Sequence, residues 1–298
     1  MKKLLTILTT LVLVAVSALA VACGNTINYT AAKDQITALT EVKAGTSDIA
    51  VIDSVMANYL VSQKEWKDDL QILTGDDFKF DTEDYAIGFR KIAGDTSTKD
   101  WVDYALYLLQ ESGDIDLIAS NYGLTGVLKE IPAKEEPAAA VAGTDFYDKV
   151  ITDGKLAIGI TLFAPMAIEG NHNPGAKGYG GFDCELAKLV ADKLAALTGE
   201  AIEYDPKIIT WSEKENELNS GNIDAIWNGF TVTEERKENI CFSEAYMVNS
   251  QAIVVRKADA TKYTDYASMK KAKFVAEEGS AGESTINDII AVKVFPAE

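Results

Sequence analysis

The sequence predicts an α/β protein in which open, mainly parallel sheets are flanked by helices. Two short stretches indicate this fold: residues 45–53 read GTSDIAVID, and residues 221–229 read GNIDAIWNG. Each begins with a glycine that can end a helix and passes through an aspartate into an apolar strand. A helix, a glycine turn and a buried strand form the repeating unit of a parallel sheet covered by helices.

Helical segments precede both stretches. ITALTEVKAG (36–45) places apolar residues at helical spacing before its glycine, and EKENELNSG (213–221) ends in the same way. Asp53 and Gly229 then fall at the carboxyl ends of the two strands, the edge at which open α/β sheets bind ligands. Two such sheets facing each other would line a cleft from both sides, although short repeats of this kind also arise by chance.

Composition and charge limit the class of protein. The 298 residues include 47% hydrophobic and 25% charged residues, so the chain can bury the core of one large domain or two smaller ones. The formal net charge is −18. Such a protein repels phosphate backbones and anionic headgroups, so we expect no nucleic acid among its partners.

The N-terminus predicts export. Lys2 and Lys3 precede the apolar run LLTILTTLVLVAVSALAVA, which ends in small residues just before Cys23, as a secretory signal does. AVACGN also resembles the bacterial lipobox, in which the cysteine is lipidated. The alternative is a transmembrane helix, because the run is just long enough to span a bilayer. We expect a signal peptide over 1–22 and a lipid-anchor tether over 23–30, which would hold the protein at the membrane outside the cytoplasm.

The chain carries none of the short motifs that mark common catalytic sites. HExxH, GxSxG, paired CxxC and P-loop patterns are missing, and the only histidine, His172, lies in the loop NHNPG. Cys184 and Cys241 are too few for a disulfide framework, and we expect buried free thiols. We therefore expect no enzyme activity, no metal and no cofactor.

A second signature follows Gly229. The stretch FTVTEERKENICFSEAY offers hydroxyls at Thr231 and Thr233, and Arg236 carries a planar guanidinium that suits a carboxylate. Taken alone, such an arginine is more often a solvated helix residue. The stretch resembles the T-x-T-x-x-R and F-S-x-x-Y signature of the bacterial extracellular solute-binding proteins of family 3, the amino-acid receptors of ABC importers. The resemblance covers nearly all of residues 146–285.

The first half of the chain resembles the rest of this family in a different order. GTSDIAVIDSVMANYLV is similar to the second-lobe element that carries the ligand aspartate, and EDYAIGFRK to the strand returning into the first lobe. WVDYALYLLQESGDIDLIASNYGL resembles the usual carboxyl-terminal helices. We interpret the chain as a circular permutant whose customary ends are fused through an acidic, Pro/Ala-rich linker. The alternative is two fragments that complete each other between molecules.

The resemblance implies a two-lobed type II periplasmic-binding-protein fold, with a mainly parallel sheet in each lobe and hinge strands between them. The permuted order predicts a second lobe from residues 31–82 and 262–298. The first lobe is expected from 83–132 and 146–261, with residues 133–145 as the linker.

The family resemblance also implies how the cleft holds an amino acid. Arg236 would bind the α-carboxylate, helped by backbone donors around Thr231 and by the amides of Ser280 and Ala281, which open a helix. Asp53 would accept the α-ammonium.

The carbonyl of Gly229 and the hydroxyl of Thr231 would complete the ammonium site. Without the family, a role for Asp53 in a turn or helix cap would be favoured.

Two aromatic residues, Phe163 and Trp211, match positions where the family encloses the ligand side chain, although core packing is the usual role of a lone aromatic. Glu277 is expected to make a polar contact, with Asn228 and Glu169 as weaker candidates. Ile160 stands where relatives that bind cationic or amide side chains often carry an acid. This difference argues against a lysine or arginine receptor. We expect a neutral ligand, polar or moderately apolar, such as glutamine or cystine.

The expected function is capture of an amino acid by closure of the two lobes, followed by delivery to the permease of an ABC importer. We expect a monomer that is attached to the membrane through Cys23. The alternatives are an amino-acid sensor lipoprotein and an enzyme similar to cyclohexadienyl dehydratase, which uses the same two-lobed architecture.

Overall fold

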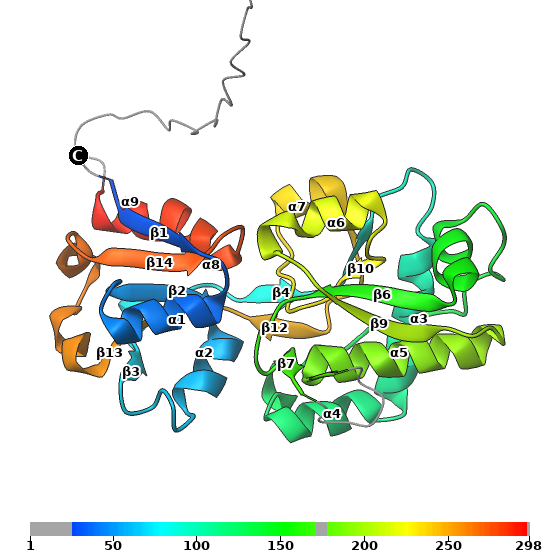
Figure 1. Ribbon diagram of the computed structural model, residues 1–298, viewed down its shortest axis with the longest axis horizontal. Helices are drawn as coiled ribbons and strands as arrows, with labels where there is room; N and C mark the ends of the chain where they lie inside the picture. Colours follow the sequence, from blue (N-terminus) through cyan, green and yellow to red (C-terminus); the bar gives the residue numbers. More distant parts are fainter. Residues whose placement is uncertain (1–25, 171–177, 297–298) are drawn as a thin grey trace, which may run out of the picture.

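Two five-stranded sheets form two lobes that lie side by side (Figure 1). The computed structural model describes residues 26–170 and 178–296, so the expected lipidation site Cys23 and the loop histidine His172 lie outside the described residues. Within these ranges, no helix has the length and apolar character that crossing a membrane requires.

The second lobe contains both ends of the described chain. Its strands, in spatial order, are β1 (Asn28–Ala32), β14 (Lys273–Glu277), β2 (Ile49–Asp53), β13 (Gln251–Arg256) and β3 (Leu70–Ile72). The first three are parallel, whereas β13 is antiparallel to both of its neighbours. Its helical segments are α1 (Gln35–Ala44), α2 (Ser54–Val61), α8 (Ala281–Ser284), η7 (Thr285–Ile290) and α9 (Ala291–Val294), with short turns η1 (Asp76–Phe78), η5 (Lys257–Lys262) and η6 (Tyr266–Met269).

Strand β2 shows how the second lobe is packed. Its successive side chains point to opposite faces of the sheet. Ile49 and Val51 join the core beneath the C-terminal helical segments, while Ala50 and Ile52 join the core beneath α1 and α2. The strand is buried throughout, as its continuous apolar run predicts.

The helix, glycine and strand unit expected before Asp53 is confirmed. Asp34 caps α1 by accepting the Thr37 N–H at 2.6 Å, and Leu39 is fully buried. At the other end Gly45 has φ +80°, a left-handed conformation that favours glycine, and β2 begins four residues later. The chain therefore delivers Asp53 to the edge of the sheet.

The first lobe repeats this arrangement. Its sheet has the spatial order β11 (Ile240–Phe242), β5 (Gly88–Arg90), β10 (Ala225–Ile226), β6 (Lys155–Ile160) and β9 (Glu203–Ile208). Strands β10, β6 and β9 are parallel, and β5 is antiparallel to β10 and β11. The helices are α3 (Ser97–Glu111), α4 (Asp114–Tyr122), α5 (Phe182–Thr198), α6 (Lys214–Ser220) and α7 (Glu234–Asn239), with shorter segments η2 (Thr125–Val127), η3 (Phe146–Ile151) and η4 (Trp211–Glu213). A small ribbon pairs β7 (Ile168–Glu169) with β8 (Tyr179–Gly180).

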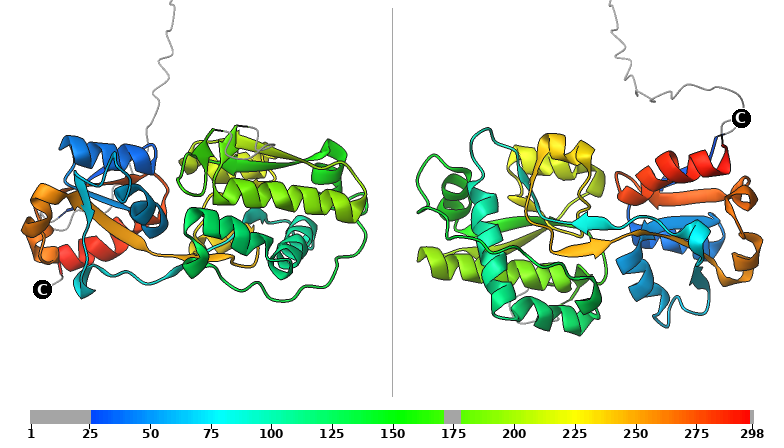
Figure 2. Two further views of the ribbon diagram at one scale, coloured as in Figure 1. Left: turned by 90° about the horizontal axis from the view of Figure 1, so that it is seen from below. Right: turned by 180° about the vertical axis from the view of Figure 1, so that it is seen from behind.

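A pair of antiparallel strands, β4 (Glu83–Tyr85) and β12 (Met247–Asn249), connects the lobes. All three views show these strands running across the gap between the two sheets (Figures 1 and 2). They are the hinge strands that the resemblance predicts. Asn249 ends β12, and only Ser250 separates it from β13 of the second lobe.

Two expected lobe boundaries differ from the structure. Residues 251–256, expected in the first lobe, form β13 and pair with β2 and β3 of the second lobe. Strand β1 begins at Asn28, inside the expected tether of residues 23–30. An apolar run such as QAIVVR fits either sheet, because its periodicity does not specify which strands will pair with it.

The linker over residues 133–145 is held against the first lobe. Just before it, Ile131 exchanges hydrogen bonds with the side chain of Gln110, at 2.6 and 3.0 Å. At its end, Asp145 accepts from the Arg90 guanidinium at 2.9 Å. The parallel pairing of β1 with β14 joins the two ends of the described chain in one sheet, which is consistent with a permuted order.

The two cysteines of the described chain are free thiols. Cys184 is buried as expected, whereas Cys241 is only half-buried, on β11 at the margin of the first-lobe sheet. Burial raises the pKa of the Cys184 thiol to about 12, so this group is inert at neutral pH.

Candidate ligand-binding site

A cavity between the lobes gathers the residues expected to bind a ligand, except the weaker candidate Glu169, which lies exposed on β7 outside the lining. The empty space of the cavity is about 270 Å³, which includes the part that is open to solvent. Its lining includes Asp53, Phe163, Trp211, Gly229, Thr231, Arg236, Glu277, Ser280 and Ala281, and is completed by Gln35 and Asn228. The second lobe provides Gln35, Asp53, Glu277, Ser280 and Ala281, and the first lobe provides the others.

Arg236 provides a positive charge on the first-lobe wall. Thr233 caps α7 by accepting the Arg236 N–H at 3.1 Å, which fixes the start of this helix. The guanidinium donates to the Thr231 carbonyl at 2.7 Å and, across the gap, to the Gly279 carbonyl at 3.1 Å. It also lies 4.7 Å from the centre of the Phe230 ring.

The charge of Arg236 is not neutralised by an ion pair. No carboxylate of the described residues lies within 4.0 Å of its guanidinium nitrogens. Burial lowers the pKa of Arg236, but an arginine remains protonated in proteins. The guanidinium can therefore bind a carboxylate that enters the cavity.

The opposite wall contributes the start of a helical segment. Ser280 caps α8, because its hydroxyl accepts the Glu283 N–H at 3.2 Å, and α8 continues through η7 and α9. The positive end of this segment therefore lines the cavity at Ala281. The Ser280 N–H already donates to the Glu277 carbonyl at 3.2 Å, whereas both amides were expected to serve a ligand.

Asp53 provides the negative charge. It is 5% exposed and makes no capping hydrogen bond to α2, so the turn or cap role favoured by its position alone does not apply. Its carboxylate accepts hydrogen bonds from the side-chain amides of Gln35, Asn249 and Gln251. Burial raises the pKa of Asp53, while the hydrogen bonds from Gln35 and Gln251 and the attraction of Arg236 oppose the rise.

Gly229 faces Asp53 from the first lobe. It has φ +59°, and a Cβ there would lie 2.4 Å from Phe163 and 3.0 Å from Tyr85, so only glycine fits. Its N–H donates to the buried Asp183 carboxylate at 2.7 Å, which also accepts from the Tyr246 hydroxyl at 2.8 Å. Asp183 thus fixes the turn at Gly229, which lines the cavity.

The second-lobe wall of the cavity also contains a carboxyl group with one unpaired oxygen. Glu277 is 4% exposed, and its Oε1 has no hydrogen-bond partner among the described residues. Burial, reinforced by the negative charge of Asp53, raises the pKa of Glu277 to about 8. Its neutral form at pH 7 can donate a hydrogen bond to a ligand.

Lys214 lies beside this wall and crosses between the lobes. Its ammonium donates to the carbonyls of Trp211 and Gly279, both at 3.2 Å. It also lies 4.9 Å from the centre of the Trp211 ring. Burial lowers the pKa of Lys214 to about 8, and Arg236 adds to this effect by repulsion.

Sequence reasoning missed the polar residues that surround Asp53. Gln35, Asn249 and Gln251 all bind its carboxylate, yet none belongs to a catalytic or ligand motif. One signal was present in MVNSQAIVVRK, where two amides flank a serine between apolar runs. Polar side chains at such a position need partners once buried, which points to a nearby charge.

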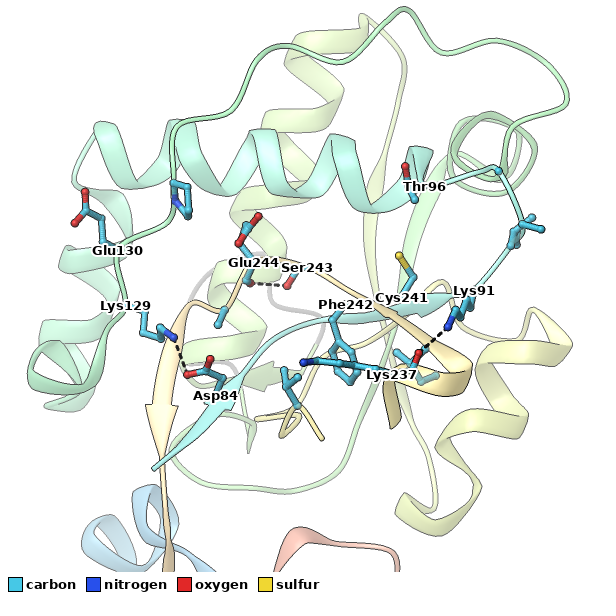
Figure 3. A pocket seen from close by; sticks show the side chains of 17 residues that line it. Asp84, Lys91, Thr96, Lys129, Glu130, Lys237, Cys241, Phe242, Ser243 and Glu244 are labelled. Carbon is cyan, nitrogen blue, oxygen red and sulfur yellow. Dashed lines mark hydrogen bonds and ion pairs between the residues drawn. The ribbon is translucent and has the colours of Figure 1, made fainter. Parts of the chain in front are cut away.

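A larger groove of about 1470 Å³ lies entirely on the first lobe and its hinge strand (Figure 3). Two of its lysines have local partners: Lys129 pairs with Asp84 at 2.7 Å, and Lys91 donates to the Lys237 carbonyl at 2.7 Å. No part of its lining belongs to the interlobe cavity. Among the described residues, no group of acids, cysteines or histidines is arranged to hold a metal ion.

Two lobes that close over a cavity with fixed charges on its walls define a solute-binding protein. The sequence profile of the bacterial extracellular solute-binding proteins, family 3, matches residues 156–291. A glutamine-binding protein of Geobacillus stearothermophilus is 30% identical over 195 residues, which are 65% of this chain and 70% of that protein. The chain belongs to this family, whose members are extracellular, and it works outside the cytoplasm.

Further relatives match over shorter lengths. The ABC transporter glutamine-binding protein GlnH of Bacillus subtilis is 31% identical over 119 residues, 40% of this chain and 42% of GlnH. Among solved structures, an ABC uptake transporter substrate-binding protein from Streptococcus pneumoniae with bound histidine is 34% identical. That match covers 36% of this chain and 39% of the other, with a TM-score of 0.28.

Proposed function

We propose that the protein captures a free amino acid between its lobes and delivers it unchanged to an ABC importer. One observation carries the proposal: the unpaired Arg236 guanidinium and the buried Asp53 carboxylate line the same cavity from opposite lobes. A zwitterion would place its carboxylate on Arg236 and its ammonium on Asp53. The names of the two glutamine-binding relatives support the same class of ligand.

The ligand would also drive closure. Arg236 and Thr231 lie on the first lobe, whereas Asp53 and Ala281 lie on the second, so a bound amino acid bridges the two. It would contact both walls only in the closed form, and this difference in contact free energy shifts the equilibrium towards closure. The permease would then engage the closed form.

The walls around the ligand side chain favour a neutral, polar amino acid such as glutamine or cystine. Phe163 and Trp211 supply buried rings, and the neutral form of Glu277 supplies a hydrogen-bond donor. Ile160 is fully buried on β6, so this position offers no acid to a cationic side chain. A ligand side chain that ends in a carbonyl oxygen or an amide fits these groups better than one that ends in a guanidinium or an ammonium.

A thermal-shift screen of the purified protein against the proteinogenic amino acids and cystine tests this proposal. A ligand at a hundred times its Kd stabilises the folded state by about 2.7 kcal/mol. For a protein of this size we expect a rise in Tm of roughly 5 °C. Shifts confined to lysine or arginine would contradict a neutral ligand. Without any shift, and with no amino acid released on denaturation by mass spectrometry, amino-acid capture would be wrong.

The proposal includes a lipid anchor on Cys23 and a monomeric protein that reaches the permease from the membrane surface. Labelled palmitate is expected to enter the wild-type protein and the Cys241→Ser control, but not the Cys23→Ser variant. The reason is that Cys23 follows the small residues AVA, whereas Cys241 lies on a folded strand. Equal labelling of wild type and Cys23→Ser would rule out this anchor.

A further inference from the structure

The hinge contains a second carboxylate, Glu83 on β4, which shares the hydrogen-bond donors of Asp53. The amide of Gln251 donates to Asp53 at 3.1 Å and to Glu83 at 3.0 Å. The amide of Asn249 likewise donates to both, and the Thr231 hydroxyl donates to Glu83 at 3.3 Å. Two carboxylates from different elements thus meet at the same two nitrogens.

No cation compensates this pair. Within the described ranges, neither Asp53 nor Glu83 has a lysine or arginine nitrogen within the 4.0 Å of an ion pair. Arg236 on α7 attracts both, but its hydrogen bonds go to backbone carbonyls. Glu277 on β14 adds a further acid near Asp53. Two partly desolvated carboxylates held by neutral amides and a hydroxyl repel each other, and such a pair tends to retain a proton.

We propose that Asp53 and Glu83 together hold one proton in the ligand-free protein and release it when an α-ammonium binds. Glu83 is a positioning residue, because it acts through the amides it shares with Asp53. In this step the O–H bond of the protonated carboxyl breaks, the proton passes to solvent, and the ligand ammonium donates to the carboxylate that remains. The proposal rests on the proposed function, since it needs a ligand with an ammonium group.

The direction of each pKa shift fits this exchange. Burial raises the pKa of Asp53, and burial together with the charge of Asp53 raises the pKa of Glu83. Tyr85, also on β4, has its pKa raised well above 10 and does not titrate in the same range. Below the raised pKa, binding must displace a proton, so affinity is expected to rise with pH by up to tenfold per unit. Above it, affinity levels off.

Isothermal titration calorimetry with L-glutamine, from about pH 5 to about pH 8 in buffers of different ionisation enthalpy, measures this proton directly. For wild type we expect release of up to one proton at the acid end. Glu83→Gln keeps the size of the side chain but removes its charge, so we expect binding with little proton release. Its affinity should change by less than about twofold per pH unit.

Three controls separate the explanations. Glu277→Gln is expected to keep the release at acid pH, because the two amides shared by Asp53 and Glu83, those of Asn249 and Gln251, make no hydrogen bond to Glu277. Asp84→Asn, beside Glu83 on the hinge strand, should behave as wild type because its carboxylate pairs with Lys129 outside the cavity. Thermal unfolding without ligand checks that each variant folds.

Each outcome decides the proposal. Proton release that survives in Glu83→Gln, or that disappears only in Glu277→Gln, overturns the assignment to Glu83. Wild-type binding with no buffer dependence at any pH overturns it even if the variant fails to fold, while amino-acid capture stands. If neither glutamine nor any other amino acid gives a heat of binding, both the proposed function and this inference are wrong.

Discussion

Arg236→Ala is expected to weaken amino-acid binding by roughly a hundredfold to several thousandfold, which corresponds to about 3–5 kcal/mol. The ligand carboxylate would remain buried between the lobes after losing the guanidinium that neutralises it. No other cation of the described residues takes this place, because the ammonium of Lys214 is already bound to the carbonyls of Trp211 and Gly279. Titration calorimetry of the variant with the ligand found in the screen measures the loss.

Two further variants test whether the loss of affinity is specific to the guanidinium of Arg236. Arg236→Lys keeps the charge but not the planar pair of donors, so we expect an intermediate loss. Lys237→Ala alters the next residue of α7, which is exposed and pairs with Glu234 at 2.7 Å, and should bind as wild type does. An Arg236→Ala protein with affinity within threefold of wild type would show that the carboxylate binds elsewhere.

Local signals in the sequence were sufficient for the elements that position these charges. The capped helix, Gly45 and the apolar run 49–52 are consecutive, and each is a property of a short segment. The same holds for Gly221 and the strand that ends before Gly229. Residues at the ends of such strands were therefore predictable as neighbours in a cleft once two sheets were expected to face each other.

Properties that depend on tertiary pairing were not predictable in this way. The run QAIVVR reads as a strand, but only its pairing with β2 and β3 places it in the second lobe. The position of Lys214 in EKENEL indicates a solvated helix residue, yet lobe closure buries it against Gly279. Each case depends on a surface from a distant part of the chain.

The polar residues that bind Asp53 could not be predicted for the same reason, because they come from distant parts of the chain. Gln35 lies 18 residues before Asp53, whereas Asn249 and Gln251 lie almost 200 residues after it. A family signature identifies the charge, but the amides that hold it come from the start of α1, the end of the hinge strand β12 and the start of β13. The ammonium site is therefore connected by hydrogen bonds to a hinge strand. A change in the hinge would alter the same hydrogen bonds that hold Asp53 for binding.

Asp53→Asn is expected to reduce affinity by at least about a hundredfold, because the ligand ammonium loses its only charged partner on the second lobe. The amide nitrogen of asparagine would also face donors, since Gln35, Asn249 and Gln251 all donate to this carboxylate. The substituted side chain therefore presents one acceptor where the ligand needs a charge. Calorimetry at about pH 7 gives the loss, and Asp84→Asn is the matched control for an aspartate outside the cavity.

The pH dependence of ligand affinity in Asp53→Asn shows whether the side chain at position 53 acts through its charge or through its shape. If the carboxylate acts through its charge, the residual binding should lose the rise in affinity with pH, because the variant has no paired carboxyl to deprotonate. Glu83 alone, freed from the repulsion of Asp53, then titrates at a lower pH. Retention of both the affinity and the pH profile of wild type would mean that the ammonium is held by the Gly229 carbonyl and the Thr231 hydroxyl without Asp53.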